Sequence, residues 1–178
     1  MVEREELERA KDFTGPVRIH VLGAEDGWID GFIVGRGPEF FVMAVLDEAN
    51  RLDGYSCLRY NRVSRCQVPA PSASRIEKTL RRYGEKPQYP EELSAPDLAQ
   101  ILKFGAHNFG LVTIEDEEPD SALIGKVRFV TNTFVQMVLI GPDGDWDPDV
   151  TEFDFIEIRR VDFGGAYERM LLRMAQRG

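Results

Sequence analysis

The sequence is poor in the residues from which metal centres and many active sites are built. Its 178 residues include two histidines and two cysteines. Cys57 and Cys66 lie nine positions apart with no second pair to complete a zinc site, and the two histidines show no metal-ligand spacing. We therefore predict no metal centre and no cofactor, and we expect both cysteines to be buried, inert thiols.

Long apolar segments are also missing. No apolar run approaches the roughly 20 residues that a helix needs to span a bilayer. The N-terminal segment MVEREELERAKDF is acidic and typical of a helix, and it lacks the apolar core of a signal peptide. These absences predict a cytoplasmic, reduced protein that does not interact with a membrane.

Catalytic motifs are absent as well. The segment GRGPEF lacks the lysine and the spacing of a phosphate-binding loop, and no glycine-rich turn joins a strand to a helix in a βαβ unit. Neither cysteine has a histidine near it in sequence. We predict that the protein is not an enzyme.

Charge is distributed unevenly along the chain. The net charge of −9 argues against broad affinity for nucleic acid or anionic membranes, because both are polyanions. Residues 59–86, however, hold eight Lys/Arg and two Asp/Glu, whereas residues 91–157 hold fifteen Asp/Glu and three Lys/Arg. This contrast indicates either two solvated faces of opposite sign, or a basic and an acidic half that serve a partner or dock on each other.

Residues 17–68 have the pattern of short strands. The segment VRIHVLG alternates apolar and polar residues, and WIDGFIVG, FFVMAVL and YSCLRYNRVSRCQV follow it between turn-forming residues. Gly31 and Gly35 suit the bend that a small barrel needs. We predict a meander that closes into a small barrel or packs as a sandwich.

Two helices are predicted after this meander. SRIEKTLRRYG has a capping box of Ser74 and Glu77 and ends at Gly84. SAPDLAQILKFG is expected to begin at Ser94 and to end at Gly105.

The strand pattern then returns. SALIGKVRFV matches WIDGFIVG with Gly125 opposite Gly31, and FDFIEIRRV matches LRYNRVSRC with Ile158 opposite Val63. The offset is 94 residues at the glycines and 95 at the last strand, and an amphipathic helix ends each half. A nearly constant offset indicates an internal duplication.

The segment GPDGDWDPDV places Asp143, Asp145 and Asp147 at alternate positions, as in a calcium-binding loop. Pro148 stands where such a loop needs glycine, and the flanking segments have strand character, so a solvated turn is the favoured interpretation and calcium the weaker one. Trp146 either folds back over the end of the barrel or is an exposed anchor for a partner.

The segment LRYNRVSRC resembles the second signature of Sm-like RNA-binding proteins. Leu58, Arg59, Val63 and Cys66 fit that pattern, whereas Tyr60 stands where the family has glycine. The segment GWIDGFIVG is similar to the bent second strand of the family. The resemblance implies a small, strongly bent five-stranded barrel with a helix, although the family's helix precedes the barrel and the helices here are expected to follow it.

The resemblance also implies a mode of binding single-stranded RNA. Sm-like proteins hold RNA with an Asp/Asn pair in one loop and with the Arg-Gly of the last strand. Arg59 carries over, with Asn61 beside it, but GRGPEFF has no Asp or Asn and Asp154 stands opposite Arg59 in the second half.

The predicted fold class is mainly β with helices (α+β). It comprises two duplicated small, strongly bent antiparallel β-barrels of Sm/SH3-like type, each followed by a helix. Residues 1–88 are predicted to hold an N-terminal helix, the first barrel and its helix. Residues 89–178 are predicted to hold a linker helix, the second barrel and the C-terminal helix.

The leading functional hypothesis is a non-enzymatic module that binds another protein through these tandem barrels, as an adaptor or an inhibitor. Trp146 is the first candidate contact. The alternative is RNA binding through Arg59, Arg62 and Arg65, which would otherwise pair with the acidic half. A hydrolase or lyase is the third class and requires a pocket between the halves with polar groups from both. Since two barrels in one chain can bury the surface used for self-association, we expect a monomer or homodimer.

Overall fold

The computed structural model describes residues 4–22, 27–116 and 122–176. Within these ranges the chain forms four α-helices and ten β-strands that join in one antiparallel sheet. The predicted α+β class is confirmed. No helix in this part of the chain is both long enough and apolar enough to cross a membrane.

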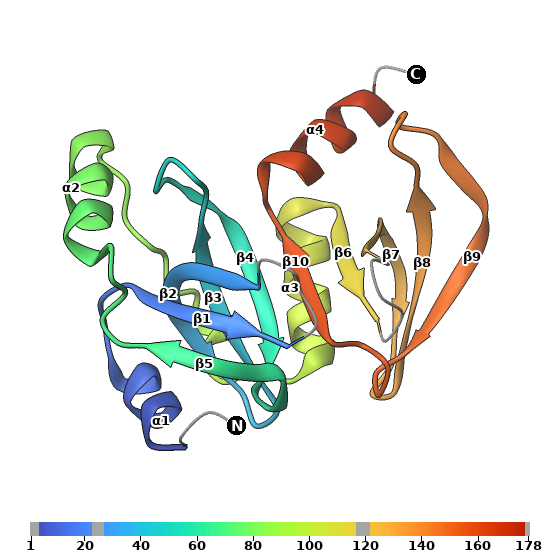
Figure 1. The fold of residues 1–178 in the computed structure, drawn as a ribbon. Helices are drawn as coiled ribbons and strands as arrows, with labels where there is room; N and C mark the ends of the chain where they lie inside the picture. Colours follow the sequence, from blue (N-terminus) through green and yellow to red (C-terminus); the bar gives the residue numbers. More distant parts are fainter. Residues whose placement is uncertain (1–3, 23–26, 117–121, 177–178) are drawn as a thin grey trace.

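The first half contains five strands, with one helix before them and another after them in the chain (Figure 1). The first four strands form a meander, and the fifth pairs with the first. The helix α1 precedes the strands and lies in the segment predicted to form an N-terminal helix. Its elements are α1 (Arg4–Asp12), β1 (Val17–Val21), β2 (Trp28–Arg36), β3 (Phe40–Leu46), β4 (Leu52–Arg59), the 3₁₀ turn η1 (Tyr60–Arg62), β5 (Val63–Gln67) and α2 (Ala73–Tyr83).

The second half repeats this order of elements. A helix precedes its five strands and another helix follows them. Its elements are the 3₁₀ turn η2 (Glu91–Leu93), α3 (Leu98–Phe109), β6 (Val112–Glu115), β7 (Ala122–Val130), β8 (Phe134–Ile140), β9 (Trp146–Asp154), β10 (Arg160–Phe163) and α4 (Ala166–Ala175).

All strands belong to one open sheet with the order β5-β1-β2-β3-β4-β10-β6-β7-β8-β9. The sheet does not close into a barrel, and β4 of the first half pairs antiparallel with β10 of the second. The prediction of two separate barrels is corrected in this respect, because the two halves share backbone hydrogen bonds. The predicted boundary at residue 88 lies between α2 and η2.

Strand pairing follows the same register in both halves. Gly31 pairs with Val45 and Gly125 pairs with Leu139, so both partners are offset by 94 residues. A register shift follows at the same relative place in each pair of strands. Adding a Cβ at Gly31 or Gly125 would bring it within 2.5 Å of a backbone oxygen of the neighbouring strand, which explains the glycine at both positions.

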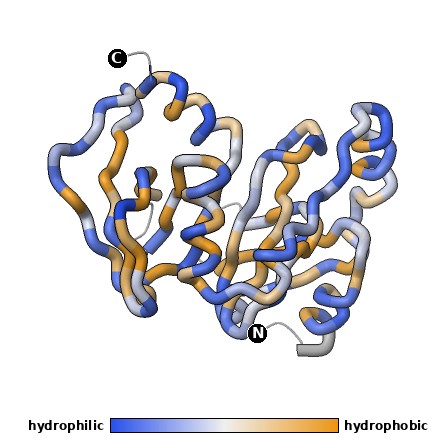
Figure 2. The backbone as a smooth tube through the Cα atoms, turned by 180° about the vertical axis from the view of Figure 1, so that it is seen from behind, coloured by the Kyte–Doolittle hydropathy of each residue, from blue (hydrophilic) through white to orange (hydrophobic). Residues whose placement is uncertain are grey.

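The largest core cluster lies between the halves. It includes Phe40 and Val42 from β3, Ile101 and Leu102 from α3, and Phe163 from β10. Helix α3 packs on β6, β7 and β10 and lies at the junction of the two halves (Figure 1). Figure 2 shows apolar residues concentrated in the strands, whereas α2 is mainly hydrophilic. Burial of this shared apolar surface holds the halves together.

Three helix boundaries differ from the predicted ones. Helix α2 ends at Gly84 as predicted, but its N-cap is Ser72 and no capping box forms at Ser74. The N-cap of α3 is Asp97 and not Ser94, and the Asp97 side chain accepts a hydrogen bond from the Gln100 N–H. The predicted stop at Gly105 is wrong because this glycine lies inside α3, where a Cβ would be 2.8 Å from the Phe163 ring. Close helix–strand packing, and not helix termination, explains it.

Candidate functional site

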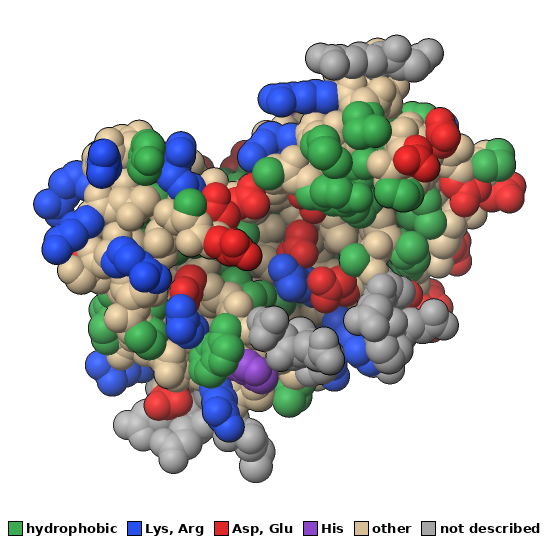
Figure 3. Space-filling model, turned by 45° about the horizontal axis from the view of Figure 1, so that its top comes forward, with side chains coloured by type: hydrophobic (Ala, Val, Ile, Leu, Met, Phe, Trp, Pro, Cys, Tyr) green, Lys and Arg blue, Asp and Glu red, His purple; other side chains and the backbone are tan. Residues whose placement is uncertain are grey.

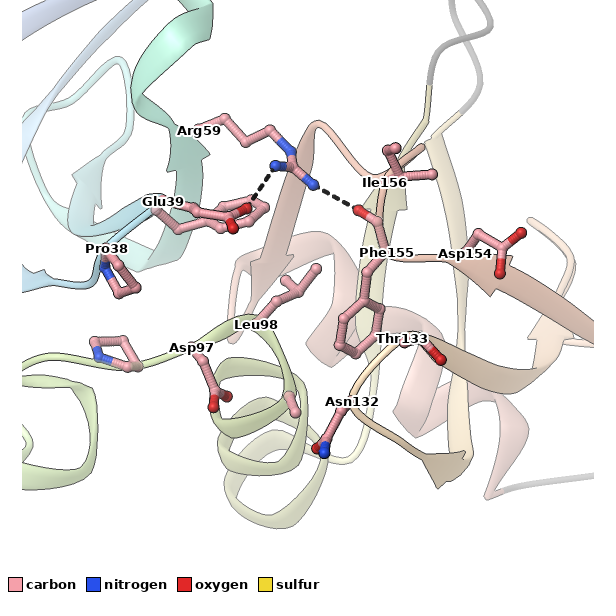
Figure 4. Close-up of a pocket in the computed structure, with 13 residues that line it drawn as sticks. Pro38, Glu39, Arg59, Asp97, Leu98, Asn132, Thr133, Asp154, Phe155 and Ile156 are labelled. Carbon is pink, nitrogen blue, oxygen red and sulfur yellow. Dashed lines mark hydrogen bonds and ion pairs between the residues drawn. The ribbon is translucent and has the colours of Figure 1, made fainter.

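Arg59 joins the two halves at the end of β4 (Figure 4). Its Nε donates to the carbonyl oxygen of Ile158 at 2.7 Å, and its Nη2 donates to that of Phe155 at 2.5 Å. Nη1 forms an ion pair with Glu39 at 2.9 Å, and the guanidinium lies 4.5 Å from the centroid of the Phe40 ring. The side chain is only 17% exposed. Arg59 therefore has its hydrogen-bonding capacity largely used inside the protein.

A pocket of about 600 Å³ lies beside Arg59, between the two halves. Figure 4 shows Leu98 and Phe155 in its middle, with Asn132 and Asp97 at the end away from Arg59. The lining residues from the first half are Pro38, Glu39, Phe40 and Arg59. Those from the second half are Pro96, Asp97, Leu98, Ala99, Asn132, Thr133, Asp154, Phe155 and Ile156.

The polar groups of this pocket are mainly acidic. Its charged lining residues are three carboxylates, those of Glu39, Asp97 and Asp154, and one guanidinium, that of Arg59. The Glu39 carboxylate is paired with Arg59, and the Asp97 carboxylate caps α3. The pocket lies between the halves and has polar groups from both, as a hydrolase or lyase would require. Two of its three carboxylates, however, already have partners inside the protein. Its negative charge disfavours a phosphate and favours an apolar or cationic side chain.

The other predicted RNA contacts do not gather around Arg59. The segment expected to form one continuous strand is broken by η1, so Arg59 ends β4 whereas Arg65 lies in β5. Asn61 and Arg65 are exposed, and Arg62 donates to the carbonyl oxygen of Leu22 at 3.2 Å. Arg59 and Arg65 therefore do not share a strand, because η1 separates β4 from β5.

The acidic segment has a more regular structure than predicted. Asp147 lies in β9, which begins at Trp146, and only Asp143 and Asp145 belong to the preceding turn. The Asp147 side chain accepts a hydrogen bond from the Asp149 N–H at 2.9 Å. Over residues 4–22, 27–116 and 122–176, no group of three His, Cys, Asp or Glu side chains is placed to hold a metal ion.

Trp146 is 40% exposed and lines a groove of about 750 Å³ between the start of β9 and α4. Tyr167 of α4 shares this groove and is 49% exposed. The indole is therefore partly buried in this groove and partly accessible to solvent.

Sequence inspection missed an ionic cluster at the back of this groove. Arg160 forms ion pairs with Asp162 at 2.8 Å and with Glu115 at 3.5 Å. Burial raises the pKa of Glu115, and the charge of Arg160 opposes this shift. Glu168 is 9% exposed and accepts a 2.6 Å hydrogen bond from Thr113. The alternating pattern of β10 is the sequence signal that could have placed Arg160 and Asp162 on one face.

Among the residues that the structure describes, two strands have a neighbour on one side only: β5 and β9, at opposite ends of the sheet. Positively charged side chains gather over α2, close to the β5 end, and negatively charged ones over the second half (Figure 3). The β9 end carries four acidic residues and two exposed apolar ones, Trp146 and Val150. The two unpaired edges therefore differ in charge.

No family model, curated protein or solved structure matches this chain. The two sheet ends and the pocket between the halves are therefore the features that indicate a function.

Proposed function

We propose that the protein is a non-enzymatic module that binds another protein through the open ends of its sheet, as an adaptor or an inhibitor. The observation that carries this proposal is the strand order, which leaves β5 and β9 with one neighbour each. An edge strand presents unpaired N–H and C=O groups that a partner strand can bind.

Accessible apolar side chains near the edges support a protein partner. Val150 in β9 is 54% exposed, and Trp146 and Tyr167 flank the same end of the sheet. Ile156, in the turn after β9, is 85% exposed. Aromatic and large apolar residues of this kind are typical anchors at protein interfaces.

We further propose that the halves are duplicated, strongly bent five-stranded units of Sm/SH3-like type. The repeated strand order and the 94-residue offset of the paired glycines support this. In this proposal the β4–β10 pairing takes up one edge of each unit and leaves the chain as a monomer or a homodimer. The two buried cysteines are consistent with a reducing compartment such as the cytoplasm.

RNA binding remains the alternative for the β5 end. It is supported by the exposure of Asn61 and Arg65 and by the basic helix α2, which follows β5 in the chain. The internal contacts of Arg59 and the acidic pocket beside it count against it, because backbone phosphates carry negative charge.

Site-specific photocrosslinking in lysate of the source cells tests the proposal. The photoreactive residue benzoylphenylalanine is placed at Arg65 on β5, at Val150 on β9, and at Phe129 on β7 as a control. Val150 and Phe129 are 54% and 55% exposed, but Phe129 lies in an inner strand of the sheet, where it pairs with Gln136 of β8. We expect a discrete protein adduct at an edge position and none at Phe129.

The adduct must also depend on strand pairing. A Thr151→Pro substitution removes one N–H from β9 and is expected to abolish the adduct at Val150. The recombinant form of the captured protein must then bind the wild-type chain and not the variant. An adduct that ribonuclease removes would favour the RNA alternative, and equal labelling at all three positions would overturn both proposals.

A further inference from the structure

The N-terminus of α4 is capped by a carboxylate from the other half. Asp53 of β4 accepts a 2.7 Å hydrogen bond from the N–H of Ala166, the first residue of α4. Arg169 lies 3.4 Å from the same Asp53 oxygen. Asp53 reaches this position because β4 pairs with β10, the strand that leads into α4. The strand that pairs with β10, β4, thus supplies a carboxylate to α4, the helix that follows β10.

The unit of β5 and α2 is the first-half counterpart of β10 and α4. Cys66 of β5 pairs with Ile19, and Val161 of β10 pairs with Ile114, so both pairs are offset by 95 residues. In the second half, the other edge of β10 holds β4. In the first half, β5 has no second strand among the residues that the structure describes. The place that β4 occupies next to β10 is therefore open next to β5.

The N-terminus of α2 lacks the cap that its counterpart has. Ser72 is the N-cap residue, but its side chain makes no capping hydrogen bond. The Ser72 Oγ is buried and has no hydrogen-bond partner. Helix α3, by contrast, has a complete capping box at Asp97. The N–H of Ala73, the first residue of α2, already donates to the carbonyl oxygen of Ala70 at 3.0 Å. The N–H groups that follow it in the first turn still need acceptors, and a group from outside the chain can supply one.

Cations line one side of α2, from Arg75 in its first turn to Arg82 in its last turn. A pocket of about 700 Å³ beside it is lined by Arg18, Arg75, Lys78 and Arg82, together with Ser72, Ser74, Thr79 and Pro71. Arg18 is paired with Asp30 at 2.6 Å. The other three cations form no ion pair with any residue that the structure describes. The positive end of the helix dipole adds to their charge and favours an anion.

We propose that β5 and the N-terminus of α2 together bind an extended acidic segment of a partner protein. The segment adds to β5 as a strand and places a carboxylate at α2, as Asp53 does at α4. This inference rests on the proposed function and adds the partner's chemistry and position. Charge complementarity and the internal β4–β10–α4 junction identify the occupant.

Selection from a random displayed peptide library provides the test. We expect the enriched peptides to be extended and acidic, and an Asp→Asn change in the selected peptide to weaken binding about tenfold, the loss of one charge-assisted contact. Fluorescence anisotropy of labelled peptides with the full chain gives the affinities.

Substitutions at α2 locate the site. Ser72→Asp gives the helix its own carboxylate and is expected to weaken peptide binding about tenfold while raising the melting temperature. This opposite effect on stability excludes unfolding as the cause. Arg75→Gln/Lys78→Gln is also expected to weaken binding about tenfold. The control Lys103→Gln/Lys126→Gln removes the same charge from exposed positions on α3 and β7 and should leave binding unchanged.

The possible failures are distinguishable. Enriched peptides that are not acidic, or that bind Ser72→Asp as well as wild type, would overturn this inference and leave the proposed function standing. No enrichment would count against both. Self-association that Ser72→Asp abolishes, seen by sedimentation velocity, would replace the partner with a second copy of the chain. Single-stranded RNA that competes for the site would replace it with nucleic acid.

Discussion

The Nε of Arg59 donates a 2.7 Å hydrogen bond to the carbonyl oxygen of Ile158, which lies 99 residues later in the chain. Arg59 is the last residue of β4, the strand of the first half that pairs with the second half. Ile158 lies two residues before β10 begins. The pair therefore fastens the β4–β10 junction beside its backbone hydrogen bonds. This position makes Arg59 a structural residue at the same place where the Sm-like resemblance suggested an RNA contact.

Arg59→Ala should lower the free energy of unfolding by about 2–3 kcal/mol, because two carbonyl oxygens lose a charged donor. Urea denaturation followed by tryptophan fluorescence measures this change. Arg65→Ala is the control, since this exposed residue should change stability by less than about 0.5 kcal/mol. Equal effects of the two substitutions would show that Arg59 does not fasten the junction.

Gly54→Ala should destabilise the protein by about 3 kcal/mol or more. Gly54 has a φ of +80°, and a Cβ there would lie 2.5 Å from the Gly165 nitrogen and from the Phe163 oxygen. Gly84→Ala separates the two causes, because Gly84 has a φ of +65° but nothing within 4 Å of the added Cβ. That control should cost about 1 kcal/mol, from backbone conformation alone. Thermal unfolding of both variants measures the difference, and similar losses would mean that close approach at Gly54 is unimportant.

The sequence was sufficient for local structure and insufficient for the junction. Alternation and turn residues predicted the strands around Gly31 and Gly125, because these signals are local. The pairing of β4 with β10 left no such signal, since it joins residues about 100 positions apart through backbone groups that every residue has. The turn η1 was missed because its residues continue a strand-like pattern. Gly105 was taken for a helix stop because sequence alone does not reveal the ring of Phe163 beside it.

In the candidate site, too, the contacts between distant residues could not be predicted from the sequence. Arg59 was recognised by its resemblance to a motif, but its acceptors are carbonyl oxygens, which no side-chain pattern can indicate. Asp53 was not recognised, because its role as a cap depends on a helix that begins 113 residues later. The acidic segment at residues 141–150 was expected to be a loop, but its second half pairs with β8 and lies in β9.

Glu85→Gln should destabilise the protein near neutral pH and have little effect in acid. The Glu85 carboxylate accepts hydrogen bonds from Arg51 at 2.6 Å and from the Leu52 N–H at 3.1 Å. The Arg51 hydrogen bond lowers the pKa of Glu85, against a smaller opposing effect of burial. Folding therefore favours the ionised form, and its contribution is complete above the ordinary pKa of about 4.5 and lost as the pH falls through the lower folded value.

Urea denaturation of wild type and variant between about pH 3 and pH 7 measures this dependence. The difference in free energy of unfolding should be small, because the pair is accessible to solvent, and should narrow toward acid. Glu77→Gln, on the exposed face of α2, is the control for the removal of one carboxylate. A difference that grows toward acid would contradict the assigned direction of the pKa shift.

Neither cysteine should react with Ellman's reagent until the protein unfolds. Cys57 is fully buried, and burial raises its pKa well above the ordinary value. Cys66 is 5% exposed, and burial raises its pKa to about 11, so both thiols remain protonated at about pH 8. Cys57→Ser and Cys66→Ser assign each reaction, and the urea-unfolded protein provides the full titration of two thiols. Cys66 packs in the cluster that includes Ala10 of α1. Rapid reaction of Cys66 alone would therefore mean that α1 separates from β5 without global unfolding, and slow reaction of both at one rate would mean that the sheet opens as a single cooperative unit.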